Sequence, residues 1–437
     1  MTKVFEYGII GMGPAGIGVA ISLANQGFAS ETVCFEQGQK DDAQVCMSAD
    51  TGICCDRDSC KVISGIGGAS NYSSGKISDY PAGSGLSFFF KSDEELRNAL
   101  SRTIQFLNKG VQLTKINISD VQRQQAKTAF EERGLEYKYY DVYEFQGREY
   151  QRFIAKVVYE MEQKGLTVLH NARVIEIEED SVNHSFFVKY SSDNHEERVL
   201  VRKLVVATGA LNVHDQLISE LEDSERSCFE IGVRVEAPSQ VFGNAFKTHG
   251  DLKLKCLNGR TYCVTENGAV MTYKSDGHIF LEGCKNLDQQ TDFSNFAVLV
   301  KRTDTSELCS ILNNYRSAFD DLPLKQTYLD YYNNKQSSNS TYTTCKAARA
   351  GDINSLFPEE VNLELKDFLN KVTTALGLPL DNLTIIAPEL KMLRSIELSS
   401  KFEVHHNLFV TGAATGRFRG ILQSICSGIE CGQEMAR

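Results

Sequence analysis

Four cysteines lie close together in the segment 46–60, at Cys46, Cys54, Cys55 and Cys60. Thiolates can bind a metal or exchange electrons, and thiols can also pack as small apolar groups. Zinc sites usually take their cysteines in CxxC pairs, and two adjacent cysteines rarely reach one metal without strain. A three-thiolate site of Cys46, Cys54 and Cys60 with a distant fourth ligand stays open, as does a redox pair. We favour structural thiols and expect no metal site.

Three glycines follow an apolar segment at the start of the chain, in the order Gly11, Gly13 and Gly16. A GxGxxG spacing directly after a strand is typical of a dinucleotide-binding turn. The first glycine allows the tight turn, the second lets the backbone approach a pyrophosphate, and the third lets helix and strand pack closely. Pro14 and Ala15 complete the turn, and we expect all five residues at the cofactor.

The segments on either side of this turn also fit a dinucleotide site. Residues 4–10 predict a buried strand, and the apolar residues after the turn are spaced as in a helix. A second strand, 32–36, ends on Glu36, whose carboxylate can accept hydrogen bonds from both ribose hydroxyls of an adenosine. Gln37 follows directly, and we expect it at the same end of the cofactor.

Length and charge restrict the classes of protein. A chain of 437 residues predicts two domains, each able to bury a core. With 46 basic and 57 acidic residues, the net charge of -11 disfavours nucleic acid and anionic membrane surfaces as partners. No apolar run is long enough for a membrane helix without being interrupted by glycines. An odd number of cysteines, 13, fits a reducing compartment, so we expect a cytoplasmic protein.

The rest of the chain alternates between helical and strand patterns. Residues 92–134 predict helices, 148–165 another amphipathic helix, and 228–302 a series of short strands separated by Gly and Asn turns. No second GxGxxG follows any strand. Either the substrate itself reduces the cofactor, therefore, or NAD(P)H binds transiently as electron donor.

Two later segments resemble parts of a known fold. Ala207-Thr208-Gly209 and Gly412-Ala413 each follow an apolar strand. With the spacing from Gly11 to Glu36, they resemble FAD enzymes of the glutathione reductase type of fold. The resemblance implies FAD as cofactor and a backbone contact from Val174. Most members of that group have Asp at the position of Ala413, where the carboxylate binds a ribityl hydroxyl, so one hydrogen bond is missing here.

A second resemblance covers nearly the whole chain. Gly65-Ile-Gly-Gly68-Ala69-Ser70 and Ser74-Gly75-Lys76, behind the cysteines, are similar to the GxGGAG...SDGKL signature of an uncharacterised family of bacterial FAD-dependent dehydrogenases. The segments 259–264, 387–390 and 419–421 resemble further signatures of that family. The chain departs from it at Ser70, Ser74 and Ala413. The resemblance implies cofactor contacts from the following residues: Gly68, Ala69, Ser70, Ser74, Lys76, Arg419, Gly420 and Ile421.

We expect an α/β fold in which an FAD-binding Rossmann-like domain carries a second, mostly antiparallel α+β domain. The FAD-binding domain comprises 1–90, 150–215 and 385–437, a helical insertion comprises 91–149, and a substrate or cap domain comprises 216–384.

Candidate catalytic residues come from the cap and the first Gly-rich loop. Tyr262 could donate a proton to a reduced substrate, and Cys263 could act as a nucleophile if its pKa were lowered. Lys76 is the cation of the loop 65–76. His249 and His278 are further acid or base candidates that no spacing favours.

These observations predict an FAD-dependent oxidoreductase that exchanges a hydride with a small or medium organic substrate. Three alternatives stay open. One is a flavin reductase or monooxygenase fed by NAD(P)H, another is a non-catalytic binding protein with a flavin fold, and the third is a thiol-disulfide oxidoreductase.

Overall fold

The computed structural model describes the chain except for residues 1–2, 41–45, 47, 49–50, 53, 55–58, 194, 212–216, 218–220, 222–225, 244–245, 247–249, 286–289, 337–340 and 400. Cys55 and His249 lie outside the described residues. Among the helices that are described, none is both long and apolar enough to cross a membrane.

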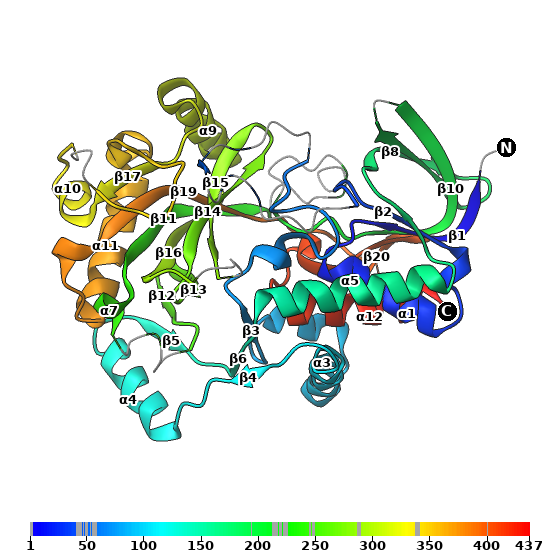
Figure 1. Ribbon diagram of the computed structural model, residues 1–437, viewed down its shortest axis with the longest axis horizontal. Helices are drawn as coiled ribbons and strands as arrows, with labels where there is room; N and C mark the ends of the chain where they lie inside the picture. Colours follow the sequence, from blue (N-terminus) through cyan, green and yellow to red (C-terminus); the bar gives the residue numbers. More distant parts are fainter. Residues whose placement is uncertain are drawn as a thin grey trace.

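A mostly parallel sheet forms the centre of the first domain, on the right in Figure 1. Its strands follow the order β20-β21-β10-β1-β2-β7. Along this path β20 pairs antiparallel with β21, and the other neighbours are parallel. The bounds are β1 (Val4–Ile10), β2 (Thr32–Phe35), β7 (Thr167–Leu169), β10 (His195–Val206), β20 (Glu403–His405) and β21 (Leu408–Val410). The strands predicted at 4–10 and 32–36 are confirmed.

Both faces of this sheet are covered, which explains why its strands are apolar throughout. Ile9 packs against the helices on one face, whereas Ile10 packs beneath an antiparallel meander on the other. The helices are α1 (Pro14–Asn25), α3 (Asp93–Leu107), α5 (Gly147–Gln163) and α12 (Ile421–Met435). The meander consists of β8 (Arg173–Asp180), β9 (Ser185–Ser192) and the first half of β10.

Helices α1 and α12 pack unusually closely through glycine. A Cβ on Gly18 would lie 2.3 Å from the Ile425 carbonyl oxygen, and one on Gly428 would lie 2.0 Å from that of Ala15. Gly432 in turn faces Ser22. From Gly428 to Gly432 on α12 the contact moves from Ala15 to Val19 and Ser22 on α1, so the two helices are parallel and their N-terminal ends point the same way (Figure 1).

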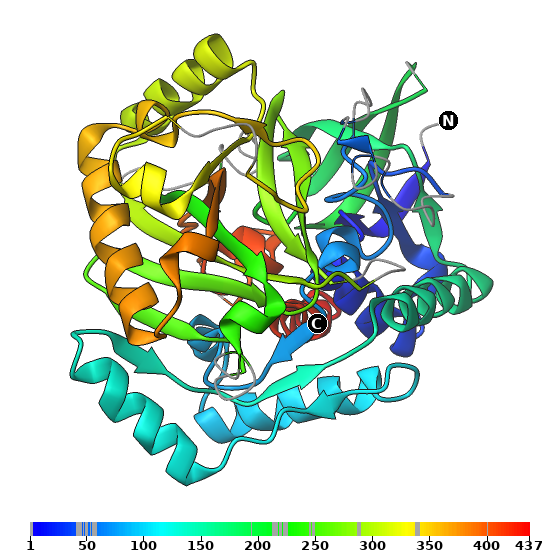
Figure 2. The same ribbon diagram turned by 60° about the vertical axis from the view of Figure 1, so that its left-hand side comes forward.

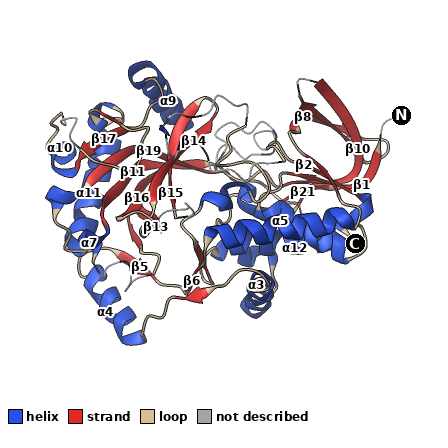
Figure 3. Cartoon of the chain, in the orientation of Figure 1, coloured by secondary structure: helices blue, strands red, loops and turns tan. Residues whose placement is uncertain are grey.

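The second domain is built on another eight-stranded, mainly antiparallel sheet, in the upper left part of Figure 2 and the left-hand group of red strands in Figure 3. Its order is β18-β17-β19-β11-β16-β13-β12-β5, in which β17 and β18 are parallel. The bounds are β5 (Glu136–Lys138), β11 (Cys228–Pro238), β12 (Lys253–Cys256), β13 (Gly259–Thr265), β16 (Phe293–Arg302), β17 (Leu324–Thr327), β18 (Arg349–Ala350) and β19 (Thr384–Leu393). The hairpin β14 (Ala269–Ser275) and β15 (His278–Cys284) packs beside it.

Period-two alternation gives this sheet two different faces. In β11, Phe229, Ile231, Val233 and Val235 enter the apolar core beneath the outer helices. The residues between them include Glu230 and Arg234, which face the other way, toward the first domain. The outer helices are α7 (Ser239–Phe242), α9 (Thr305–Phe319), α10 (Tyr328–Tyr332) and α11 (Glu359–Ala375).

The segments that join the two domains differ from the predicted division. Strand β5 belongs to the predicted helical insertion, yet it extends the second sheet by pairing with β12. Strand β19 belongs to the predicted FAD-binding domain, yet it pairs with β11 and β17 in the second sheet. Burial explains β19, because its alternate apolar residues complete the second core. The α/β class with a second α+β domain is confirmed.

Smaller elements complete the connection. The insertion carries α3 and α4 (Asp120–Glu131) as predicted, and a small sheet is formed by β3 (Lys76–Ser78), β6 (Val142–Glu144) and β4 (Thr114–Lys115). The short 3-10 helices are η1 (Ala29–Glu31), η2 (Gly68–Tyr72), η3 (Ser84–Phe89), η4 (Ile353–Ser355), η5 (Leu380–Asn382) and η6 (Gly412–Thr415).

Candidate functional site

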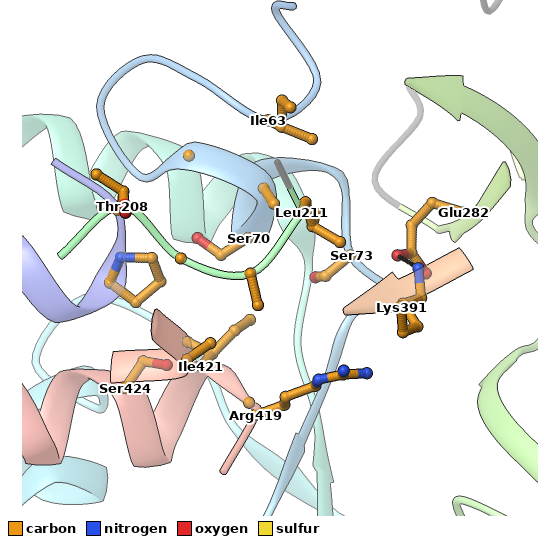
Figure 4. Close-up of a pocket in the computed structure, with 18 of the residues that line it drawn as sticks. Ile63, Ser70, Ser73, Thr208, Leu211, Glu282, Lys391, Arg419, Ile421 and Ser424 are labelled. Atoms are coloured by element: carbon orange, nitrogen blue, oxygen red, sulfur yellow. Dashed lines mark hydrogen bonds and ion pairs between the residues drawn. The ribbon is translucent and has the colours of Figure 1, made fainter. Parts of the chain in front are cut away.

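A cavity of about 1770 Å³ lies between the two domains. Gly-rich turns and strand ends of the first domain form one wall, and the polar face of the second sheet forms the other. Figure 4 shows Thr208 and Ser70 on the first side and Glu282 and Lys391 on the second. Apart from Ala15, Gly16, Gly412 and His278, every described residue that was predicted for the cofactor site or for catalysis lines this cavity.

The GxGxxG turn has the conformation that its glycines predict. Gly11 adopts a φ of +93°, which favours glycine, and its N–H donates to the Phe35 carbonyl at 2.8 Å. A Cβ on Gly16 would lie 1.9 Å from the Gly11 carbonyl oxygen, so any side chain there would separate helix from strand. Gly13 is different, because a Cβ on it would meet no atom within 4 Å. Gly13 is also the N-cap of α1, without a side-chain cap.

Glu36 ties three backbone segments together. Its buried carboxylate accepts hydrogen bonds at 2.8 Å from the N–H groups of Met12, Gly38 and Gly65. A carboxylate offers about four acceptor positions, so one direction is left for a ribose hydroxyl rather than the two that the sequence suggests. Gln37 lines the cavity beside it, and Val174 lines the same end.

The loop 65–76 packs directly on the GxGxxG turn. The Gly67 N–H donates to the Met12 carbonyl at 2.8 Å, and Gly68, with a φ of +51°, lies against Gly13. The Ser70 hydroxyl donates to the Gly67 carbonyl at 2.6 Å and also contacts the Tyr150 hydroxyl at 2.9 Å. Its polar atom therefore holds the loop in shape.

Two other turns complete this wall. Thr208, in the Ala207-Thr208-Gly209 turn after β10, has a buried hydroxyl that meets no hydrogen-bond partner among the described residues. Ala413 lines the cavity from η6, and Gly420 is the N-cap of α12, again without a side-chain cap. The N-terminal ends of α1 and α12 therefore both face the cavity.

Lys76 lines the cavity, but its charge is already paired. The ammonium group lies 3.1 Å from a Glu266 carboxylate oxygen and donates to the Gly250 carbonyl at 3.1 Å. The side chain is nearly fully buried and connects the first Gly-rich loop to the second domain. These contacts favour a positioning role over chemistry at the cofactor.

Tyr262 and Cys263 lie on the opposite wall, in the middle of β13. Burial, reinforced by the charge of Glu282, raises the pKa of Cys263 to about 11 and that of Tyr262 to about 12. A neutral tyrosine hydroxyl suits a proton donor. The thiol is also neutral at pH 7, so the nucleophilic role considered for Cys263, which needs a lowered pKa, is not supported.

The remaining sequence candidates lie elsewhere. His278 is buried and its Nδ1 lies 2.6 Å from an Asp321 carboxylate oxygen, outside the cavity lining. Cys46 belongs to the core of the second domain, whereas the Cys60 sulfur accepts a hydrogen bond from the Lys274 N–H and lines the cavity. No three His, Cys, Asp or Glu side chains gather into a metal-binding group within the described part of the chain.

Sequence reasoning missed a buried charge cluster on the second wall. Arg234 and Glu389 form a bidentate pair with both N···O distances at 2.7 Å, and Lys391 lies 2.6 Å from Glu282. The Arg234 guanidinium also lies 3.5 Å from Glu282, which links the two pairs. Arg234, Glu389 and Lys391 are almost completely buried.

Within this cluster, the opposite charges shift each other's pKa values toward the ionised forms. Burial alone would lower the pKa of Lys391, but Glu282 outweighs it and leaves that pKa raised. Burial would likewise raise the pKa of Glu282, but Lys391 and Arg234 leave it lowered. Lys391 and Glu282 are therefore both ionised. The signal in the sequence is charge at even-spaced positions of otherwise apolar segments, at 230, 234 and 236 in 228–238 and at 389 and 391 in 384–393.

Comparisons with known proteins give structural likeness alone. No family model matches the chain, and no curated protein matches its sequence. A flavoprotein/dehydrogenase from Cytophaga hutchinsonii is 10% identical with a TM-score of 0.42, over 99% of this chain and 78% of that one. A 3-ketosteroid-delta4-(5alpha)-dehydrogenase from Rhodococcus jostii RHA1 is 11% identical with a TM-score of 0.40, over 100% of this chain and 97% of that one.

The halogenase CmlS, described as flavin-dependent, is 10% identical with a TM-score of 0.42, over 99% of this chain and 57% of that one. Identities and scores this low transfer no activity to this chain. Its function is therefore inferred from its own residues.

Proposed function

We propose that the protein is an FAD-dependent oxidoreductase that exchanges a hydride with an organic substrate held between the two domains. One observation carries the proposal. The parallel helices α1 and α12 both direct N-terminal ends without side-chain caps into the same cavity. Parallel helix dipoles at close range repel each other, and an anion at their common positive end removes that cost. A dinucleotide pyrophosphate has the required charge.

The residues present fit FAD. The backbone at Gly13 is open to the cavity with no atom within 4 Å of a Cβ position, as a pyrophosphate needs for close approach. The Thr208 hydroxyl is a buried polar group without a partner among the described residues, which a ligand atom could satisfy. The cavity exceeds the roughly 300 to 1,000 Å³ typical of single-ligand pockets, so cofactor and substrate have room together.

Each part of FAD has candidate residues along this wall. Gly11, Gly13 and the first turn of α1 would hold the pyrophosphate, and Glu36 would accept one ribose hydroxyl. Val174 and Gln37 would line the adenine end. When bound, FAD supplies hydride transfer at N5.

The remaining contacts concern the flavin end. The start of α12, at Gly420 and Ile421, would place a positive dipole end beside the ring. Ala413 supplies no carboxylate for the ribityl chain, so backbone groups of η6 would have to replace that hydrogen bond.

Residues of the second wall would act on the substrate. Tyr262, held neutral by burial, can donate a proton to a reduced product from within the cavity. Its ring is fixed by Arg260 at 4.8 Å and Lys253 at 5.0 Å from the ring centre.

The proposal is tested by recording the absorbance of the purified protein and identifying the cofactor that it releases. We expect flavin absorbance that coelutes with the protein and a released cofactor that is FAD after denaturation. Anaerobic mixing with NADH and NADPH then separates a nicotinamide-fed reductase, in which the flavin bleaches, from a dehydrogenase reduced by its own substrate. A protein that neither carries flavin nor binds added FAD would refute the proposal.

A further inference from the structure

The polar face of the second sheet has more positive than negative charge where it meets the cavity. Lys255 of β12 pairs across the strands with Arg260 of β13, and Lys253 and Tyr262 follow on the same face two residues along. Successive residues of a strand point to opposite faces, so these four side chains point together. The whole chain carries a net charge of -11, so this local excess of cations is not a reflection of composition.

Most cations around this end of the cavity have a carboxylate of their own. Lys391 is paired with Glu282, and Lys253 lies 3.0 Å from Asp251. One carboxylate, Glu230, serves two guanidinium groups. Arg260 binds it with two nitrogens, and Nη1 of Arg419 lies 3.6 Å from Glu230 Oε2.

A third cation at Glu230 has no carboxylate of its own. Among the described residues, Lys255 has none within ion-pair distance, although it lines the cavity. Burial, and then the charges of Lys138 and Arg260, lower the pKa of Lys255. Burial would raise the pKa of Glu230, but Arg260 and Arg419 outweigh it and leave it lowered. Glu136 lies opposite Lys255 across the strands, but its carboxylate is engaged by Lys138 at 3.3 Å. Arg260, Arg419, Lys255 and Lys138 thus share the carboxylates of Glu230 and Glu136, which leaves uncompensated positive charge.

One nitrogen of the Arg419 guanidinium forms no hydrogen bond with the described residues at this end of the cavity. Its Nη2 donates to the Met392 carbonyl, whereas Nη1 is buried and meets no hydrogen-bond acceptor in the described part of the chain. Figure 4 shows Arg419 reaching from the start of α12 toward Lys391. The Tyr262 hydroxyl lies in the same wall and likewise forms no hydrogen bond with any described residue. A buried donor without an acceptor costs free energy that a bound acceptor recovers.

We propose that Arg419, Lys255 and Tyr262 form a subsite for an oxyanion, so that the substrate is an organic acid whose carboxylate or phosphate group binds here. This inference rests on the proposed function, because it assigns a substrate class to the same cavity. The guanidinium and ammonium groups neutralise the charge of the substrate, and its remaining part extends toward the Gly-rich wall. Arginine forks match both carboxylate and phosphate, which is why the two head groups are compared directly.

The test uses three ligands with the same ring: benzoate, phenyl phosphate and benzamide. Binding to the purified holoprotein is measured by titration calorimetry, and the bound flavin of every sample is recorded. We expect at least one of the two anions to bind about 10- to 100-fold more tightly than benzamide, as a charge-assisted hydrogen bond predicts. The better of the two identifies the head group.

The variants Lys255→Gln and Arg419→Gln should each remove most of that preference while benzamide affinity stays the same. Arg133→Gln, at an exposed position after α4, loses the same charge far from the cavity and should keep the preference. Equal affinity for benzoate, phenyl phosphate and benzamide, or no binding of either anion at millimolar concentration, would overturn the subsite.

Flavin content separates this failure from failure of the proposed function. If the protein carries no flavin but still prefers the anion, the subsite is supported and the proposed oxidoreductase function is refuted. A flavin-loaded protein without the preference for the anion overturns the subsite and leaves the proposed oxidoreductase function standing. Unchanged anion affinity in both variants overturns the subsite even if the preference exists in the original protein.

Discussion

The second and third glycines of the GxGxxG turn, Gly13 and Gly16, allow a matched test of the cofactor site. Replacing each of them by alanine should have a different effect. Gly13 has φ and ψ of -71° and -175°, which any residue can adopt, and a Cβ there meets nothing within 4 Å. Replacing an N-cap glycine by alanine, which is a poorer N-cap, costs about 0.5 to 1.5 kcal/mol, and lower entropy of the unfolded chain offsets about 0.4 to 1 kcal/mol. The free energy of unfolding of Gly13→Ala should therefore stay within about 1 kcal/mol of the original.

Gly16→Ala should destabilise the fold itself. Its Cβ would lie 1.9 Å from the Gly11 carbonyl oxygen and 3.3 Å from Ile9 Cγ2, so helix α1 would have to move away from β1. Overpacking of this kind costs about 1 to 3 kcal/mol, and sometimes more when backbone must move. We expect an earlier unfolding midpoint for Gly16→Ala, with loss of flavin as a consequence.

Both variants are measured by urea unfolding and by the flavin that remains bound after gel filtration. Gly13→Ala should unfold like the original protein yet lose flavin, because the added methyl group occupies the place where a pyrophosphate must touch the backbone. A loss of one charge-assisted hydrogen bond corresponds to about 10- to 100-fold in affinity. Full flavin retention in Gly13→Ala, or unfolding as early as Gly16→Ala, would refute the reasoning.

Three further predictions concern the second wall. Lys391→Met or Glu282→Gln alone should lower the unfolding free energy in urea by about 3 to 5 kcal/mol, and the double variant by less than the sum, because each single change strands a buried charge. Cys263, with its pKa raised to about 11, should react with iodoacetamide more slowly than free cysteine at pH 7 and faster as the pH rises; rapid labelling at pH 7, seen by mass spectrometry, would contradict this. Glu230 and Glu282 have pKa values below their ordinary 4.5, so their stabilisation is complete above that pH and disappears as the pH falls below it; equally high unfolding midpoints at pH 3 and 7 would exclude it.

The first domain could be predicted almost element by element, because its signals are local. The turn at Gly11 to Gly16 and the end of β2 at Glu36 depend on residues that are near one another in the chain. The second domain was harder. Strand β5 gains its partner only from β12, far along the sequence, and nothing in its own short segment indicates a sheet edge.

The same distinction holds for the site. The sequence by itself determined the Gly-rich wall, since positive φ favours glycine and a close backbone approach leaves no room for a Cβ. Only the tertiary structure decided the opposite wall, where Arg234, Glu282, Glu389 and Lys391 come from three strands, β11, β15 and β19, that are far apart in the sequence. Charged residues at alternate strand positions normally face water. Here Glu282 and Lys391 line the cavity between the two domains instead, because the second sheet packs against the first domain.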